Sequence, residues 1–172
     1  MKVLFLDVDG VLNSEPYYMQ HLDDMRANPI DPEGVKRLAQ IVEATGAIIV
    51  LSSSWRGGWD PDPDRMDIDG QILTKELSKC DLEIYDKTDY IEYGRRAREI
   101  KAWLKESEEK VESFVILDDC NYAWDKHGLS RRWVRTDFID GGLLDEGVEK
   151  AIEILNRKFT FTEKIKMKVL EP

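Results

Sequence analysis

The chain has 172 residues, which is the size of one domain and too short for two enzymes in tandem. Hydrophobic residues make up 42% of the chain and charged residues 35%, a composition that excludes a disordered or fibrous protein. The net charge of -10 argues against a protein that coats long nucleic acid or an anionic membrane.

The sequence also lacks the features of a secreted or membrane protein. No apolar run reaches the length of a signal-peptide core or of a membrane span. Cys80 and Cys120 are far apart in the sequence and have no neighbouring Cys or His at a zinc-site spacing. We therefore expect a cytoplasmic protein without a disulfide framework or a structural zinc site.

The first half of the chain predicts a strand, a helix and a second strand. Residues 2–6 form a short apolar run that is typical of a buried parallel strand. Asp31 and Pro32 are typical of a helix start, and the apolar spacing then continues until Gly46. The β-branched run over 47–51 predicts the next strand.

The second half continues this alternation after an interruption. Between Gly57 and Tyr93, Gly, Pro and Asp residues break the pattern, and we interpret the segment as a short insertion or loop outside the core. The spacing of Ala97, Ile100 and Leu104 then predicts a helix. Further along the chain we expect a buried strand over 113–117, a short strand over 133–135 and a final helix over 148–155. The alternation predicts an α/β fold with a parallel sheet covered on both faces, and the tail from 159 stays unassigned.

Three of the predicted strands end in polar side chains, where open α/β sheets bind their ligands. These ends are Asp7-Val8-Asp9-Gly10, Ser52-Ser53 and Asp118-Asp119. Clustered carboxylates repel one another unless a cation holds them, and an oxygen-only set favours Mg²⁺. Such a site suits phosphoryl transfer, with one carboxylate as nucleophile and a second as proton donor and acceptor. The alternatives are a hydrogen-bonded turn at Asp7 and Asp9 and a helix cap at Asp118.

A second copy of the Asp-x-Asp-Gly pattern occurs at Asp67-Ile68-Asp69-Gly70. No apolar strand precedes it, and we interpret it as part of a solvated acidic loop. The pattern alone is therefore a weak indicator of a metal site.

The motifs, taken together, resemble those of haloacid dehalogenase (HAD) superfamily phosphatases. The matching segments, in the order of that family, are LFLDVDGVLN at 4–13, IIVLSSSWR at 48–56 and VILDD at 115–119. The chain is also similar to small phosphatase domains of nucleic-acid end-repair enzymes of the polynucleotide kinase-phosphatase type. The segments that carry this similarity are SSSWR, RRAREIKAWL at 95–104 and VRTDFIDGGL at 134–143. The resemblance implies a Rossmann-like three-layer sandwich with a minimal cap or none, spanning 1–172 as one domain.

The resemblance also implies roles for individual residues. Asp7 is the expected nucleophile, Asp9 the general acid and base, and Ser52, or Ser53 in its place, the contact to the phosphoryl group. Mg²⁺ is expected at Asp7, Asp118 and the backbone carbonyl of Asp9, with support from Asp119. Gly10 and Arg56 are further expected substrate contacts, although Trp55 and Arg56 have packing and ion pairing as equal alternatives.

The third motif departs from the family pattern, which places a lysine at a helix start. Here the helix opens with Arg95-Arg96, and we expect Arg96 in this role, with Lys87 and Lys101 as competitors and a surface arginine as the alternative.

The expected substrate is a nucleotide or the terminal phosphate of a nucleic acid, because a site without a large cap is open. A basic cluster of Lys126, Arg131, Arg132 and Arg135, and the aromatic residues Trp55, Trp59, Tyr122 and Trp124, favour this hypothesis. Two other hypotheses stay open: a sugar-phosphate phosphatase and a non-catalytic module that binds phosphorylated partners.

Overall fold

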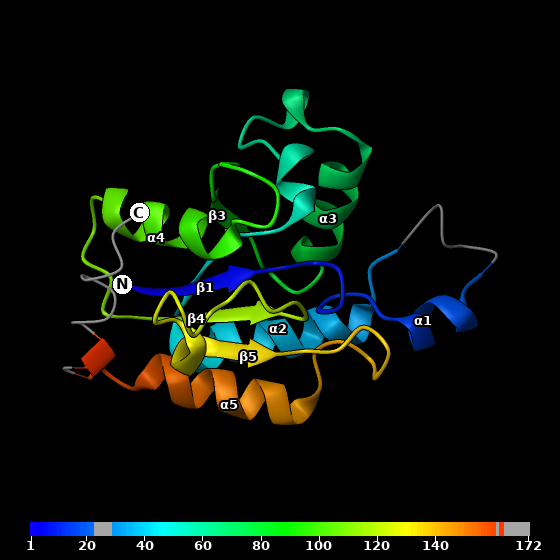
Figure 1. Ribbon diagram of the computed structural model, residues 1–172. Helices are drawn as coiled ribbons and strands as arrows, with labels where there is room; N and C mark the ends of the chain where they lie inside the picture. Colours follow the sequence, from blue (N-terminus) through cyan, green and yellow to red (C-terminus); the bar gives the residue numbers. More distant parts are fainter. Residues whose placement is uncertain (23–28, 161, 164–172) are drawn as a thin grey trace.

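The computed structural model describes residues 1–22, 29–160 and 162–163. Its centre is a five-stranded parallel sheet in the order β3-β2-β1-β4-β5 (Figure 1). The strands are β1 (Lys2–Leu6), β2 (Ile48–Leu51), β3 (Ile84–Lys87), β4 (Ser113–Asp118) and β5 (Trp133–Arg135). β1 is central and pairs with β2 and β4, so their carboxyl ends lie side by side.

Helices cover both faces of the sheet, which confirms the predicted three-layer α/β fold. α2 (Pro32–Thr45) and α5 (Asp145–Asn156) lie on one face, and α4 (Arg96–Glu106) lies on the other (Figure 1). Alternate residues of β1 point to opposite faces, so Leu4 and Leu6 pack on the α2 and α5 side while Val3 and Phe5 pack towards α4. The two remaining helices are α1 (Glu15–Gln20) and α3 (Ile68–Ser78), and one-turn 3₁₀ helices span Ser54–Gly57, Pro63–Arg65 and Ser130–Arg132.

The boundaries of α2 confirm the capping signals in the sequence. The Asp31 carboxylate accepts a hydrogen bond from the backbone N–H of Glu33 at 2.9 Å, and Pro32 is the first helical residue. Gly46 ends the helix with a φ of 65°, in the left-handed region that glycine adopts without strain.

The segment between Gly57 and Tyr93 is not outside the core, so that prediction was wrong. It supplies α3 and the edge strand β3, and its side chains Trp59, Leu73 and Leu77 belong to the main core cluster. The sequence pattern did not predict β3, because Ile84 is its only strongly apolar residue. A strand at the edge of a sheet can form with so little apolar content.

The second Asp-x-Asp-Gly pattern is a helix cap. The Asp67 carboxylate accepts a hydrogen bond from the backbone N–H of Gly70 at 3.0 Å and begins α3. The acidic loop before it is therefore shorter than we expected, and the two copies of the pattern have different local structures.

One member of the predicted basic cluster, Arg132, is buried in a structural network. Its Nε donates to Glu163 Oε1 at 2.9 Å, and its Nη1 donates to Ser113 Oγ at 2.8 Å. Burial raises the pKa of Glu163, but hydrogen bonds from Thr160 and Arg132 outweigh it and bring that pKa to about 2.

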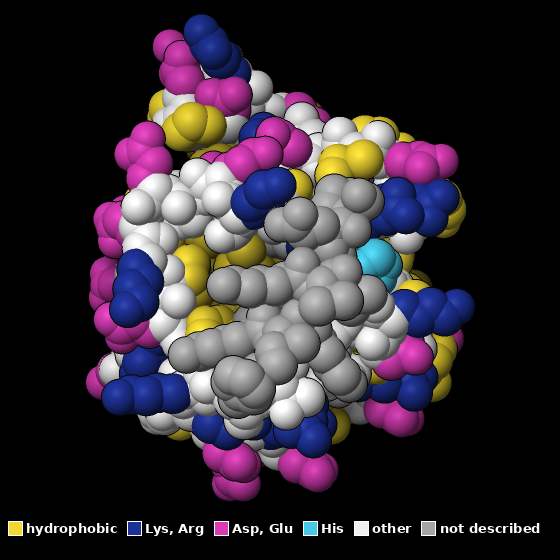
Figure 2. All heavy atoms as spheres, turned by 60° about the vertical axis from the view of Figure 1, so that its left-hand side comes forward, with side chains coloured by type: hydrophobic (Ala, Val, Ile, Leu, Met, Phe, Trp, Pro, Cys, Tyr) yellow, Lys and Arg dark blue, Asp and Glu magenta, His cyan; other side chains and the backbone are white. Residues whose placement is uncertain are grey.

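Most of the unassigned tail lies outside the described residues. The face in Figure 2 carries basic and acidic side chains interspersed around a group of hydrophobic side chains.

Candidate active site

The carboxyl edge of the sheet brings two buried carboxylates together. Asp7 follows β1 and Asp118 ends β4, and their exposed fractions are 5% and 1%. Arg96, the first residue of α4, contacts both: its Nη1 donates to Asp118 Oδ2 at 2.7 Å and also to Asp7 Oδ2. One nitrogen reaches both oxygens, so these oxygens are close enough to share a cation.

The two carboxylates carry more negative charge than Arg96 neutralises. Burial raises the pKa of Asp7, although the charge of Arg96 and hydrogen bonds from Ser53 and Arg96 oppose the shift. Burial also raises the pKa of Asp118 to about 7, with the charge of Asp7 adding to the effect and Arg96 opposing it. Burial lowers the pKa of Arg96, but the two carboxylates outweigh it and raise that pKa above its ordinary value. Arg96 is therefore charged, and a further cation would relieve the repulsion that remains.

Asp9 lies at the exposed rim of this site, and neutral donors hold both of its oxygens. Asn13 Nδ2 donates to Asp9 Oδ1 at 2.9 Å, and Trp55 Nε1 donates to Asp9 Oδ2 at 3.1 Å. Burial and the charge of Asp9 raise the pKa of Tyr18, whose side chain bonds Asn13. Asn13 and Tyr18 were not among the predicted site residues, and Trp55 was expected as a substrate contact or stacking face rather than as a partner of Asp9. The position of Asn13 inside the first motif was the available signal.

The serines after β2 differ in their hydrogen bonding. Ser52 is buried, and its Oγ has no hydrogen-bond partner among the residues that the structure describes. Ser53 Oγ accepts from the backbone N–H of Trp55 at 3.3 Å, and its side chain also hydrogen-bonds Asp7. A buried hydroxyl without a partner is costly. Ser52 is therefore the better placed of the two to donate to a bound group.

Gly10 makes the turn after Asp9 and leaves room for Asp119. Its φ is +72°, and a Cβ at this position would lie 2.5 Å from Asp119 Oδ2. Its backbone N–H donates to Asn13 Oδ1 at 2.9 Å, so this amide already has a partner. The observed role of Gly10 is thus steric, which differs from the substrate contact that the resemblance implied.

The side chains at the edge fit a hard divalent cation. Among the described residues, the one group of three candidate ligand atoms that lie within 4.8 Å of one another comes from Asp118, Asp119 and Cys120. Burial, and then Asp119, raise the pKa of the Cys120 thiol to about 11, so the thiol is protonated at neutral pH and is a poor ligand. Asp7 and Asp9 are not members of this group, although Asp7 approaches Asp118 through their shared nitrogen donor. The donors that remain are oxygens, which Mg²⁺ prefers.

A family model described as the HAD domain in Swiss Army Knife RNA repair proteins matches residues 3–168. The chain belongs to this family. No curated protein and no solved structure matches the chain. In the part of this HAD domain that the structure describes, no helix is both long and apolar enough to cross a membrane.

Other basic residues proposed for the site of this HAD domain lie elsewhere. Arg56 donates from Nη2 to Glu99 Oε2 at 3.0 Å and from Nη1 to the Ser53 carbonyl at 2.8 Å, so it links the 3₁₀ turn after β2 to α4. Lys87 donates to two backbone carbonyls, those of Arg56 and Trp59. Of the candidates for the third motif, Arg96 is thus the residue that contacts the acidic pair.

The aromatic residues of the sequence analysis divide into two groups. Trp59 and Trp124 are buried in the core, and Trp59 also lines a cavity away from the acidic residues. Trp55 and Tyr122 are half-buried at the site, and the Tyr122 ring lies 4.7 Å from the guanidinium carbon of Arg96.

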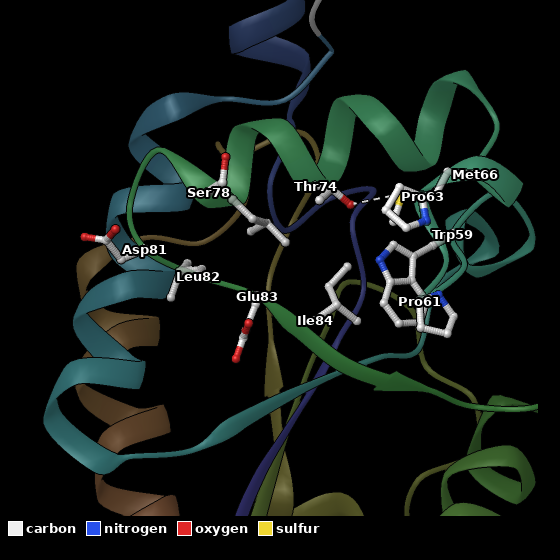
Figure 3. Close-up of a pocket in the computed structure, with 11 residues that line it drawn as sticks. Trp59, Pro61, Pro63, Met66, Thr74, Ser78, Asp81, Leu82, Glu83 and Ile84 are labelled. Atoms are coloured by element: carbon white, nitrogen blue, oxygen red, sulfur yellow. Dashed lines mark hydrogen bonds between the residues drawn. The ribbon is translucent and has the colours of Figure 1, made fainter.

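One cavity of the HAD domain is separate from the acidic site. It has a volume of about 520 Å³ and lies between α3 and the chain leading into β3, where Trp59, Pro61, Met66 and Ile84 line it (Figure 3). None of the acidic residues at the strand ends lines this cavity.

Proposed function

We propose that this HAD domain is a Mg²⁺-dependent phosphomonoesterase that acts on terminal phosphates of nucleic acid through an aspartyl-phosphate at Asp7. The observation that carries the proposal is the pair of buried carboxylates, Asp7 and Asp118, which share one nitrogen of Arg96 beside the unpartnered hydroxyl of Ser52. A buried site with unbalanced negative charge and an unused donor suits a cation together with a phosphoryl group.

The side chains have complementary roles in the proposed reaction. A carboxylate oxygen of Asp7 attacks phosphorus and the bond to the ester oxygen breaks, while Asp9 gives its proton to that leaving oxygen. Asp9 then takes a proton from water, whose oxygen attacks phosphorus and releases the Asp7 carboxylate. The sum is hydrolysis of a phosphomonoester to an alcohol and inorganic phosphate. Trp55 and Asn13 hold Asp9 at the rim, where both proton transfers take place.

The metal ligands in this proposal are the side chains of Asp7 and Asp118 and the backbone carbonyl of Asp9, with Asp119 beside them. Bound Mg²⁺ supplies positive charge that lets an anionic carboxylate approach an anionic phosphate. Arg96 keeps Asp7 and Asp118 oriented, and Ser52 Oγ donates to a phosphoryl oxygen.

The nucleic-acid substrate is supported by the description of the family, which places such domains in RNA repair proteins. The exposed rim at Asp9 is consistent with it, because the end of a polymer needs an unobstructed approach. A sugar phosphate is less well supported, since the segment between Gly57 and Tyr93 builds α3 and β3 and its cavity lies away from the acidic residues.

The test is Mg²⁺-dependent phosphate release from 3′- and 5′-phosphorylated oligonucleotides, mononucleotides and sugar phosphates. Asp7→Asn is expected to abolish release, whereas Asp67→Asn, in the second copy of the pattern, is a matched control that keeps wild-type rates and its helix cap. Absence of turnover with every phosphomonoester would refute the enzymatic proposal. Full activity of Asp7→Asn would refute the covalent intermediate alone.

A further inference from the structure

Exposed aromatic and basic side chains adjoin the candidate active site on the segment that leads from β3 into α4. Tyr90 and Tyr93 have exposed fractions of 68% and 91%, and Arg95 and Arg98 are exposed as well. Arg96, which contacts the acidic pair, lies between the two arginines in the sequence. We call Tyr90, Tyr93, Arg95 and Arg98 the α4 surface.

The α4 surface presents two exposed cations in a chain with a net charge of -10. Arg95 and Arg98 are three residues apart at the start of α4, so they lie on one side of it. His127 lies near these arginines. Burial lowers the pKa of His127, and the charges of Lys101, Arg98 and Arg95 lower it further, while Asp125 opposes the shift.

Two exposed carboxylates, Asp89 and Glu92, lie in the same segment as the α4 surface. Arg95 pairs with Glu92 at 3.0 Å, but both side chains are about half exposed, and such pairs contribute little. Arg98 has no ion pair within the described residues. Both arginines are therefore able to bind an anion.

The backbone beneath the exposed tyrosines is held in place. The buried carboxylate of Glu99 accepts a hydrogen bond from the backbone N–H of Ile91 at 3.1 Å and forms an ion pair with Arg56 at 3.0 Å. The Arg56 guanidinium also lies over the Tyr90 ring, at 5.5 Å from its centroid. A ring held in this way loses little conformational freedom when a ligand stacks on it.

We propose that the α4 surface binds the single-stranded segment that carries the terminal phosphate. Bases stack on Tyr90 and Tyr93, and backbone phosphates bind Arg95 and Arg98. Aromatic faces next to cations are the combination that single-stranded nucleic acid recognises, whereas an acidic peptide needs only the cations. The inference rests on the proposed function for the position of the end, and it predicts that oligonucleotide ends are preferred to mononucleotides.

The first test measures binding of a labelled, terminally phosphorylated single-stranded hexanucleotide in EDTA, where no Mg²⁺-dependent turnover occurs. Arg95→Ala/Arg98→Ala removes two phosphate contacts, which lowers the slope of log affinity against log salt by about 1.4. Between 50 and 200 mM salt, wild-type affinity is then expected to fall about sevenfold more than that of the variant. The control, Lys36→Ala/Arg65→Ala, removes two exposed cations that also pair with an acid three residues away, and is expected to bind like the wild type.

The second test separates bases from simple anions. Tyr90→Ala/Tyr93→Ala is expected to weaken hexanucleotide binding about thirtyfold or more, because two stacked bases are lost with the two rings. Tyr85→Ala, at an exposed tyrosine in β3, is the control and is expected to have no effect. Polyglutamate of equal charge should compete poorly with the hexanucleotide. Wild-type binding by either double variant, or equal competition by polyglutamate, overturns the inference.

The third test connects the α4 surface to activity. For both double variants, kcat/KM with the phosphorylated hexanucleotide is expected to fall about tenfold while kcat/KM with a mononucleotide stays unchanged. Equal loss with both substrates, or no loss with either, contradicts the inference. A wild type that releases no phosphate from any substrate refutes the proposed function, whereas the binding tests still decide whether the α4 surface holds a nucleic-acid strand.

Discussion

Replacing Asp118 by asparagine isolates the free-energy cost of burying two carboxylates beside one guanidinium. Burial raises the pKa of Asp118 from its ordinary value of 3.8 to about 7, so the folded state binds this proton more tightly than the unfolded state does. The free energy of unfolding therefore falls as pH rises from about 4 to about 7. At about 1.4 kcal/mol per pH unit, the metal-free loss reaches at most about 4 kcal/mol.

The amide that Asp118→Asn introduces cannot ionise, so its contribution to stability does not change over this pH range. The experiment is urea unfolding of the wild type and Asp118→Asn in EDTA, from pH 4 to pH 8. The difference in unfolding free energy, variant minus wild type, is expected to rise with pH by up to about 4 kcal/mol. Constant effects of the amide, including its poorer contact with Arg96, cancel in this pH dependence. With saturating Mg²⁺ the wild type is expected to regain stability at pH 8.

A difference that stays flat from pH 4 to pH 8 in EDTA would refute the reasoning, because it would mean that the buried pair does not resist ionisation. The control is Asp67→Asn, whose carboxylate is exposed and caps α3, and whose difference from the wild type is expected to change little with pH.

Three further predictions follow from individual contacts. Gly10→Ala places a Cβ 2.5 Å from a carboxylate oxygen at a φ of +72°. Urea unfolding should therefore show that the free energy of unfolding falls by about 2 kcal/mol or more. The control is Gly57→Ala, which has open space around its Cβ and should leave stability unchanged. Trp55→Phe removes the hydrogen bond to Asp9 and is expected to lower kcat about tenfold with KM unchanged; an equal rise in KM would contradict this positioning role. Glu163→Gln leaves a buried arginine unpaired and should cost about 3 kcal/mol at pH 7. Because the pKa of Glu163 is about 2 in spite of its burial, wild-type stability should fall as the pH is lowered from 4.5 towards 2. The stability of Glu163→Gln should not fall by this mechanism. Parallel curves of stability against pH for the two proteins would contradict the role given to the Glu163 carboxylate.

The strands that carry the site could be predicted because each is an unbroken apolar run that stops at polar residues. Asp7 and Asp118 therefore lie where the sequence analysis expected them, at adjacent strand ends. Arg96 could be chosen from its place at a helix start, but its shared contact with both carboxylates is a tertiary feature. The assigned catalytic and metal-binding roles stay predictions until the assays are done.

The remaining features depend on contacts that the sequence pattern does not contain. β3 is a short edge strand with little apolar content, so it carries no periodic signal. Arg132 looked like part of a basic surface because its partner Glu163 is 31 residues away. In the same way, the hydrogen bond from Trp55 to Asp9 joins two motifs between which α1 and α2 lie.

The central position of β1 has a consequence for how the molecule is made. β1 is synthesised before every other described strand, yet its second neighbour, β4, ends only at Asp118. At ordinary synthesis rates roughly ten seconds separate the two, and during this time one edge of an apolar strand has no partner. Pairing across such a long sequence separation is intrinsically slow. Asp7 and Asp118 meet only when β1 pairs with β4, so any activity of the site reports that this pairing has formed.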